Sequence, residues 1–192
     1  MHNSGLDKKK GFFFLISFLI ASLLYSNSAF TEHSNLEYKI KAGYLYNFTK
    51  FVSWPEDSLQ TFNICILGKD PFGSIINPIE KRSVGNKSIR LFRFQSINQV
   101  KDCHIVYFGK SKKKWGRSGF PLTGILAVGS FKNSLTVSES KKFSKAGGMV
   151  AFFLENGKVK LHINLKALRQ SGLEVSAKLL EVAEVYEGES NE

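Results

Sequence analysis

The sequence predicts one α/β domain: a single three-layer fold with a mostly parallel sheet flanked by helices and a C-terminal β-hairpin joined to the sheet. In the first half of the chain, helical periodicity alternates with short apolar runs of strand length. In the second half, Asn156-Gly157 separates two apolar runs, which is a strong hairpin signal. The length of 192 residues suits one domain.

The N-terminus has the pattern of a secretory signal peptide, which we assign to residues 1–28. Lys8–Lys10 are positive, Phe12–Tyr25 form an apolar run, and Ser26-Asn27-Ser28 fits a signal peptidase. The apolar run is shorter than the roughly 20 residues that a membrane-spanning helix needs. We therefore favour a cleaved signal over a retained anchor, and we expect the mature protein to be periplasmic.

The rest of the chain divides into a flexible segment (29–39), the α/β domain (40–186) and an acidic tail (187–192). The formal net charge of +11 could suit a nucleic-acid partner. However, the basic residues are dispersed, with one tight cluster at Lys110 and Lys112–Lys114, and export separates the protein from nucleic acid. We therefore expect no nucleic-acid partner and a solvated basic surface that faces anionic lipid or an acidic protein.

The first predicted element is a helix over Asn35–Val52, with Asn35 as its N-cap. Apolar residues at three- and four-residue spacing form one stripe: Leu36, Ile40, Tyr44, Phe48, Phe51 and Val52. The helix should end at Ser53-Trp54-Pro55, because a residue before proline disfavours the helical conformation.

The alternation of elements then continues to Phe108. In chain order we expect a strand at Phe62–Leu67, a helix from Asp70-Pro71 to Arg82 that Pro78 could shorten, a turn at Val84–Lys87, a strand at Ser88–Phe94, a short helix at Ser96–Val100 and a strand at His104–Phe108. Asp70 and Pro71 have the residue types of an N-cap and a first helical position.

The second half begins with an exposed loop and ends with the hairpin and two helices. We expect a loop at Lys110–Thr123, a strand at Gly124–Val128, hairpin strands at Met149–Leu154 and Val159–Leu165, a helix over Leu165–Gln170 capped by Asn164 and ended by Gly172, and a last helix over Ser176–Val185. His162 alternates with apolar neighbours and should lie on a solvated face of its strand.

Cys65 and Cys103 are the two cysteines of the chain. An exported chain with an even number of cysteines favours a disulfide, and one pairing is possible; two buried free thiols are the alternative. A zinc site would need His104 and His162 as further ligands. No close ligand pair such as Cys-x-x-Cys exists, and adjacent Cys103 and His104 should point to opposite strand faces. We therefore expect no metal site.

Four segments in this order resemble the YfiR-like family of periplasmic proteins: KAGYLYNFTKFVSWP (Lys41–Pro55), ICILGKDPFG (Ile64–Gly73), CHIVYFGKS (Cys103–Ser111) and GGMVAFFLENGKVKLHINLKALRQSGLEVSAKLL (Gly147–Leu180). The resemblance implies the family's disulfide between the second and third segments, at Cys65 and Cys103. The best-known member has a second cysteine pair near the Gly-Gly-Met motif, and this chain has no cysteine there.

The resemblance also implies a non-catalytic regulator that represses an inner-membrane diguanylate cyclase, and with it cyclic di-GMP and biofilm, until an outer-membrane lipoprotein captures the regulator. A histidine kinase is the other inner-membrane partner that the family implies, and a homodimer is compatible with the sequence. The alternative function is a periplasmic small-ligand sensor that acts with a histidine kinase. Its ligand crevice would lie at the carboxyl ends of the strands.

No enzyme activity and no cofactor are expected, because His33, His104 and His162 stand in no recognised catalytic motif. The candidate residues for binding a partner or ligand are Trp54, His162, Arg169 and Lys178. Trp54 could anchor a partner or fill the core at the end of the first helix, and we favour the core. Arg169 could bind an anionic ligand or a partner carboxylate, or lie on a solvated helix face.

Overall fold

The computed structural model describes residues 35–109, 131–139 and 141–187. The predicted signal peptide, the loop Lys110–Thr123, the strand Gly124–Val128 and residues 188–192 of the acidic tail lie outside the described residues. Residues 1–37 and residues 38–192 form two separate units. The second unit holds the sheet and both hydrophobic clusters.

The first helix spans residues 35–51, so it includes residues 35–39 that the division of the chain placed in a flexible segment. Its buried line, continued by Val52, repeats at spacings of four, three and four: Lys41, Leu45, Phe48 and Val52. The predicted stripe was therefore only partly right, since Ile40 is 41% exposed. A lysine takes the place expected for an apolar residue because Glu139 pairs with Lys41 inside the protein.

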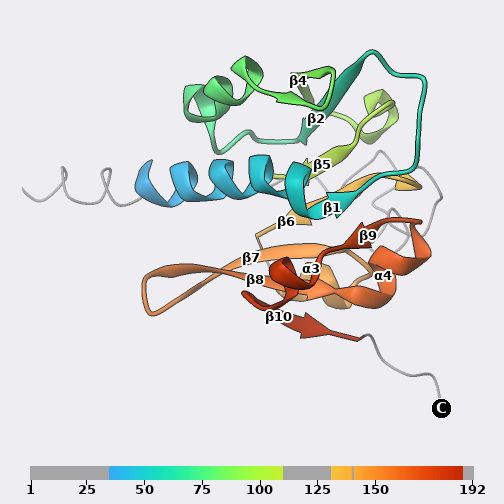
Figure 1. The fold of residues 1–192 in the computed structure, drawn as a ribbon. Coiled ribbons are helices and arrows are strands. Elements are labelled where there is room, and N and C mark those ends of the chain that lie inside the picture. Colours follow the sequence, from blue (N-terminus) through green and yellow to red (C-terminus); the bar gives the residue numbers. More distant parts are fainter. Residues whose placement is uncertain (1–34, 110–130, 140, 188–192) are drawn as a thin grey trace, which may run out of the picture. The chain divides into compact units, whose positions relative to one another are not determined.

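Within the described residues, eight strands form one sheet in the order β10-β8-β7-β6-β5-β2-β4-β3 (Figure 1). Their bounds are β2 Thr61–Leu67, β3 Ser83–Val84, β4 Lys87–Phe94, β5 Ile105–Phe108, β6 Leu135–Ser138, β7 Val150–Glu155, β8 Lys158–Asn164 and β10 Ala183–Tyr186. The pairs β3–β4 and β7–β8 are antiparallel, and the other neighbours are parallel. Separately, β1 (Val52–Ser53) pairs antiparallel with β9 (Glu174–Val175).

Helices pack against both faces of this sheet. One apolar cluster joins the first helix to alternate residues of β2 and β5, to the 3-10 helix η1 (Gly73–Lys81) and to the helices α4 (Leu165–Gln170) and α5 (Ala177–Leu180). A second cluster contains the remaining alternate residues of β2 and β5 and Phe143 of the helix α3 (Lys141–Lys145). The helix η2 (Ile97–Gln99) contributes Ile97 to its edge. The predicted three-layer α/β class, with a mostly parallel sheet, is confirmed.

Strong local signals gave correct elements. The β7–β8 hairpin turns at Asn156 and Gly157, whose φ angles of 50° and 73° suit the positive-φ turn that this pair favours. The Asn164 side chain accepts a hydrogen bond from the Ala167 amide at 3.0 Å and caps α4, and Gly172 ends it with φ 78°. The Asp70 carboxylate accepts from the Phe72 amide at 2.7 Å, but the helix after it is 3-10.

Two predictions were wrong, and one strand was not predicted. The last helix ends at Leu180, and Ala183–Tyr186 form strand β10, which pairs with β8 far from it in sequence. Leu135–Ser138 form strand β6, which was not predicted, although Asn133 with φ 63° marks a turn before it. His162 is buried rather than solvated, because Tyr186 of the unexpected β10 stacks on it with ring centroids 5.7 Å apart.

Cys65 and Cys103 form a disulfide with their Cα atoms 6.0 Å apart, as predicted. Cys65 lies in β2 and Cys103 two residues before β5, so the bond links two neighbouring strands of the parallel sheet. Across the described residues, we find no helix with the length and apolar character needed to span a bilayer.

Candidate functional site

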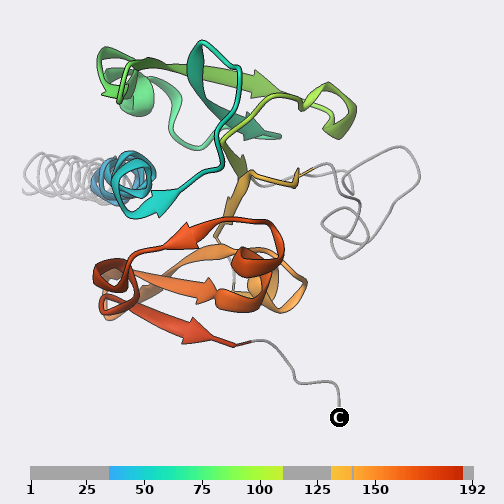
Figure 2. The ribbon, with the colours of Figure 1, turned by 45° about the vertical axis from the view of Figure 1, so that its right-hand side comes forward.

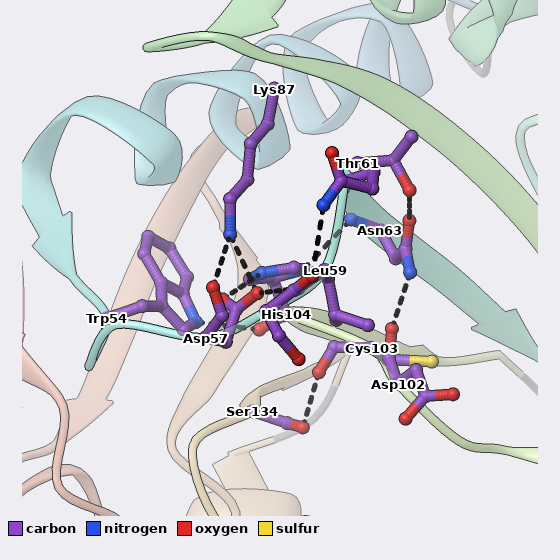
Figure 3. A network of polar contacts seen from close by, with 12 residues as sticks. Trp54, Asp57, Leu59, Thr61, Asn63, Lys87, Asp102, Cys103, His104 and Ser134 are labelled. Atoms are coloured by element: carbon purple, nitrogen blue, oxygen red, sulfur yellow. Dashed lines mark hydrogen bonds and ion pairs between the residues drawn. The ribbon is translucent and has the colours of Figure 1, made fainter.

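A polar network surrounds His104 at the amino ends of the parallel strands β2, β5 and β6 (Figure 3). His104 immediately precedes β5, and Asn63 lies near the start of β2. Asp57 comes from the connection between β1 and β2, and Lys87 begins β4. The topology of the sheet thus brings together four residues that are far apart in the sequence.

Both ring nitrogens of His104 are occupied. Nδ1 accepts a hydrogen bond from the backbone N–H of Asn63 at 3.0 Å, and Nε2 lies 2.9 Å from Oδ2 of Asp57. Because Nδ1 must be an acceptor, the neutral imidazole carries its proton on Nε2 and donates it to the carboxylate. The ring also stacks on Phe62 with centroids 4.3 Å apart. The tautomer and the orientation of His104 are therefore both fixed.

Asp57 holds a negative charge at the rim of this network. Partial burial opposes its ionisation, but hydrogen bonds from Lys87, His104 and the Leu59 amide outweigh it and lower the pKa of Asp57 to about 2. Lys87 Nζ lies 2.7 Å from Asp57 Oδ1. Burial lowers the pKa of His104 below its ordinary value, against the pull of Asp57. A neutral imidazole beside an ionised carboxylate is thus the state at neutral pH.

A cleft of about 320 Å³ opens beside the network. Trp54, Asp57, Asp102, His104 and Lys132 are among the residues that line it. The cleft lies at the amino edge of the parallel strands, whereas ligands of open α/β sheets bind at the carboxyl edge. Charges of both signs around it give no clear preference for an anionic or cationic ligand.

The chemistry available in this cleft is limited. His104 can take a proton from a nucleophile only by giving up the hydrogen bond from Asn63, since Nε2 already bears a proton. The nearby Ser134 hydroxyl donates to the backbone carbonyl of Cys103 at 2.5 Å. The described residues also contain no group of three His, Cys, Asp or Glu side chains arranged to hold a metal ion. The geometry suits a structural tie better than proton transfer.

The network instead fixes the backbone around the disulfide. The Asn63 side-chain amide donates to the carbonyl of Asp102 at 2.7 Å, next to Cys103. The Trp54 indole N–H donates to the carbonyl of His104 at 3.0 Å. The end of the first helix, β2 and the start of β5 are therefore held together by side chains as well as by the sulfur bond.

The structure does not bring the sequence-predicted binding residues into one site. Trp54 is half-buried, packs edge-on against Phe62 at 5.0 Å and lies against the buried core cluster. Arg169 and Lys178 are exposed on α4 and α5, and Arg169 Nη1 lies 3.8 Å from Glu187. In the described part of the chain, no hydrogen bond, ion pair or ring contact joins any two of Trp54, His162, Arg169 and Lys178.

Sequence reasoning missed Asp57, Asn63 and Lys87. The sequence places His104 at the start of a buried strand, and a buried histidine needs partners for its ring nitrogens. This requirement could have indicated a polar network around His104, but it does not show which carboxylate binds the ring. Asp57 reaches His104 only because the chain folds back after Pro55.

The family model described as YfiR/HmsC-like matches residues 38–184. The chain belongs to the YfiR/HmsC-like family. The match covers both cysteines, the His104 network, the hairpin and the first half of β10. No curated protein matches the chain.

Among solved structures, the chain is similar to one described as the ABC domain in complex with L-Trp from Streptococcus pneumonia. The identity is 11%, the TM-score is 0.48, and the match covers 73% of this chain. The chain spans 58% of the length of that protein. We infer nothing about the function of the YfiR/HmsC-like chain from a similarity this distant.

Proposed function

We propose that the protein is a non-catalytic periplasmic regulator that binds a membrane-bound signalling protein and represses a diguanylate cyclase. The observation that carries the proposal is the family match over residues 38–184, which reaches from the first helix into β10. The family suggests such a regulator of cyclic di-GMP and biofilm. An outer-membrane lipoprotein that captures the regulator would complete the pathway.

Two features of the site support a regulator over an enzyme or a ligand sensor. The imidazole of His104 is locked by Asn63 and Asp57, so it is poorly placed to act as a general base. The cleft lies at the amino edge of the sheet, away from the carboxyl ends where the ligand-sensor alternative placed its crevice. The protein therefore acts through its surface.

Deletion of the gene tests the proposal. Loss of a repressor should raise cellular cyclic di-GMP and biofilm, and the wild-type gene supplied in trans should restore both. Unchanged cyclic di-GMP in the deletion strain would overturn the cyclase target. Co-purification of the protein with a histidine kinase in that case would keep the regulatory class and replace the target.

Export is a separate part of the proposal, and the Cys65–Cys103 disulfide agrees with an oxidising compartment. Fractionation of cells should recover the protein from the periplasm, and N-terminal sequencing should begin at about residue 29. Recovery of the uncut chain from the cytosol with both thiols free would contradict the proposed compartment.

A further inference from the structure

A groove of about 230 Å³ runs between the first helix and η1; we call it the helix–η1 groove. Its apolar wall consists of Ala42 and Tyr46 from the helix and of Ile75, Pro78 and Ile79 from η1. Ile79 is buried, but Pro78 is exposed and Ile75 and Tyr46 are half-buried. The groove is thus a partly exposed apolar surface.

Gly43 lines the same groove from the middle of the first helix. Glycine inside a helix is unfavourable relative to alanine, because it loses more backbone freedom on folding. A Cβ added at Gly43 would meet nothing within 4 Å, so no packing in the described fold requires glycine there. A surface on which another backbone approaches closely would require it.

The ends of the groove are positively charged. Lys39 and Arg82 line it, and none of its lining residues is acidic. Lys50 lies over the Tyr46 ring at 4.6 Å, and Arg82 lies near the same ring at 5.8 Å. Neither Lys39, Lys50 nor Arg82 forms an ion pair in the described part of the chain. Their charges are available to carboxylates from another molecule.

We propose that the helix–η1 groove docks a protein segment with an apolar centre and acidic ends, supplied by the membrane-bound signalling partner; this rests on the proposed function. Tyr46, where the second cationic end begins, is seven positions after Lys39, which is about 10 Å along a helix. Carboxylates at positions i and i+7 of a partner helix have the same spacing. Apolar residues between them would cover Gly43 and Ile75.

The test uses the full-length chain in the deletion strain, with cyclic di-GMP as the readout. Gly43→Trp fills the groove, and Lys39→Glu combined with Arg82→Glu reverses its charge. The matched controls are Asn98→Trp and the pair Lys101→Glu with Lys158→Glu, all at exposed positions away from the groove. Periplasmic level and the intact disulfide are checked for each variant.

We expect the wild type and both controls to lower cyclic di-GMP, and both groove variants to leave it at the level of the deletion strain. Repression by the groove variants that equals the wild type would overturn the groove as the docking surface while leaving the proposed function intact. Failure of the wild type itself to lower cyclic di-GMP would overturn the proposed function and the partner assigned to the groove.

Gly43→Ala tests, without the partner, the premise that the fold itself does not require glycine at position 43. Because nothing in the fold needs glycine there, alanine should raise Tm by about 1–4 °C through better helix propensity. A lower Tm would show that Gly43 serves the fold, and the inference would fail.

Two measurements on purified protein address other occupants. Light scattering that finds a wild-type dimer and a Gly43→Trp monomer would assign the groove to a second copy of the chain. Binding to phosphatidylglycerol vesicles that is lost in the charge-reversed variant would assign it to lipid. Either result would overturn the assignment of the groove to the signalling partner. A wild type that is monomeric and does not bind the vesicles would support that assignment.

Discussion

The two edges of the parallel sheet carry polar clusters of opposite character. At the amino edge, neutral His104 links Asn63 to Asp57, and Lys87 completes the cluster. At the carboxyl edge, Lys41 of the first helix lies 2.8 Å from Glu139, which follows β6. The Tyr107 hydroxyl of β5 donates to the same carboxylate at 2.7 Å. Both clusters tie residues distant in sequence.

Their burial differs, and this decides how much each one matters. The side chains of Lys41 and Glu139 are 3% and 17% exposed, whereas those of Lys87 and Asp57 are 31% and 30% exposed. Burial tends to raise the pKa of Glu139, but Lys41 and Tyr107 outweigh it and lower that pKa. The carboxyl-edge cluster thus depends on a complete charge pair, while water can replace part of the amino-edge cluster. Figures 1 and 2 show the strands of the sheet that carries them.

Removal of Lys41 should therefore have the largest effect. Lys41→Met leaves the Glu139 carboxylate buried without its cation and should lower the free energy of unfolding by about 3–5 kcal/mol, measured by urea denaturation. Lys141→Met, which breaks an exposed ion pair with Glu184, is the matched control and should lose less than about 1 kcal/mol. Equal losses in the two variants would contradict the difference in burial.

Loss of the disulfide should have the second-largest effect on the free energy of unfolding, and it removes a link at the amino edge. For cysteines 38 residues apart, the chain-entropy estimate for Cys65→Ala with Cys103→Ala is a loss of about 4 kcal/mol, with typical values of about 2–4 kcal/mol. Urea denaturation with and without reductant measures it. The double variant should be insensitive to reductant, and a wild type equally insensitive would contradict a stabilising bond.

His104→Phe should have a smaller effect, because the ring can still stack on Phe62. The Asn63 amide and the Asp57 carboxylate lose their partner, and the expected loss of unfolding free energy is about 1–3 kcal/mol. His162→Phe is the control, since the buried Nδ1 of His162 has no hydrogen-bond partner in the described structure. Urea midpoints should therefore fall more for His104→Phe than for His162→Phe.

The smallest expected effects are in the pH dependence of stability, where the groups at the two edges titrate in different pH ranges. Burial keeps the pKa of folded His104 below 6.5, so the unfolded chain binds a proton first and stability falls as pH drops below about 6.5. Asp57, with a folded pKa of about 2 against 3.8, contributes stability that is lost as pH falls from about 4 towards 2. Glu139, whose pKa is also lowered, contributes stability that is lost as pH falls below about 4.5.

Denaturation series between pH 8 and pH 2 measure these contributions. His104→Phe should reduce the loss between pH 7 and pH 5, and the remainder comes from His162, whose pKa burial also lowers. Asp57→Asn should reduce the loss below pH 4. It also removes the carboxylate that raises the pKa of His104, so the loss between pH 7 and pH 5 should become larger rather than smaller. An unchanged upper part in His104→Phe would show that His104 does not remain neutral in the folded protein.

The sequence predicted the elements that local chemistry determines. Asn156-Gly157 marks its turn by tolerating positive φ, and Asn164 marks a helix start by accepting an amide hydrogen bond. The cysteine pairing was predictable because the chain has two cysteines and a secretory pattern. These signals need no knowledge of distant residues.

The parts that failed depend on distant partners. The apolar residues near Val185 fit a helix or a strand, and only pairing with β8 selects the strand. Lys41 is buried because Glu139 meets it from another element, and Asp57 matters because it reaches His104. Composition and periodicity do not show which charged residues will meet, so neither polar cluster could be predicted.

The pairing of β1 with β9 has a consequence for the order of assembly. Val52 opposes Val175, and the Phe51 carbonyl accepts from the Ser176 amide at 2.8 Å, so partners 123 positions apart in the sequence (175 − 52) close this ribbon. A polypeptide that emerges N-terminus first leaves the end of its first helix without these backbone bonds until Val175 and Ser176 have also emerged. Contacts with such wide sequence separation slow folding, and a chain truncated before Glu174 would leave Val52 and Ser53 with no strand to pair.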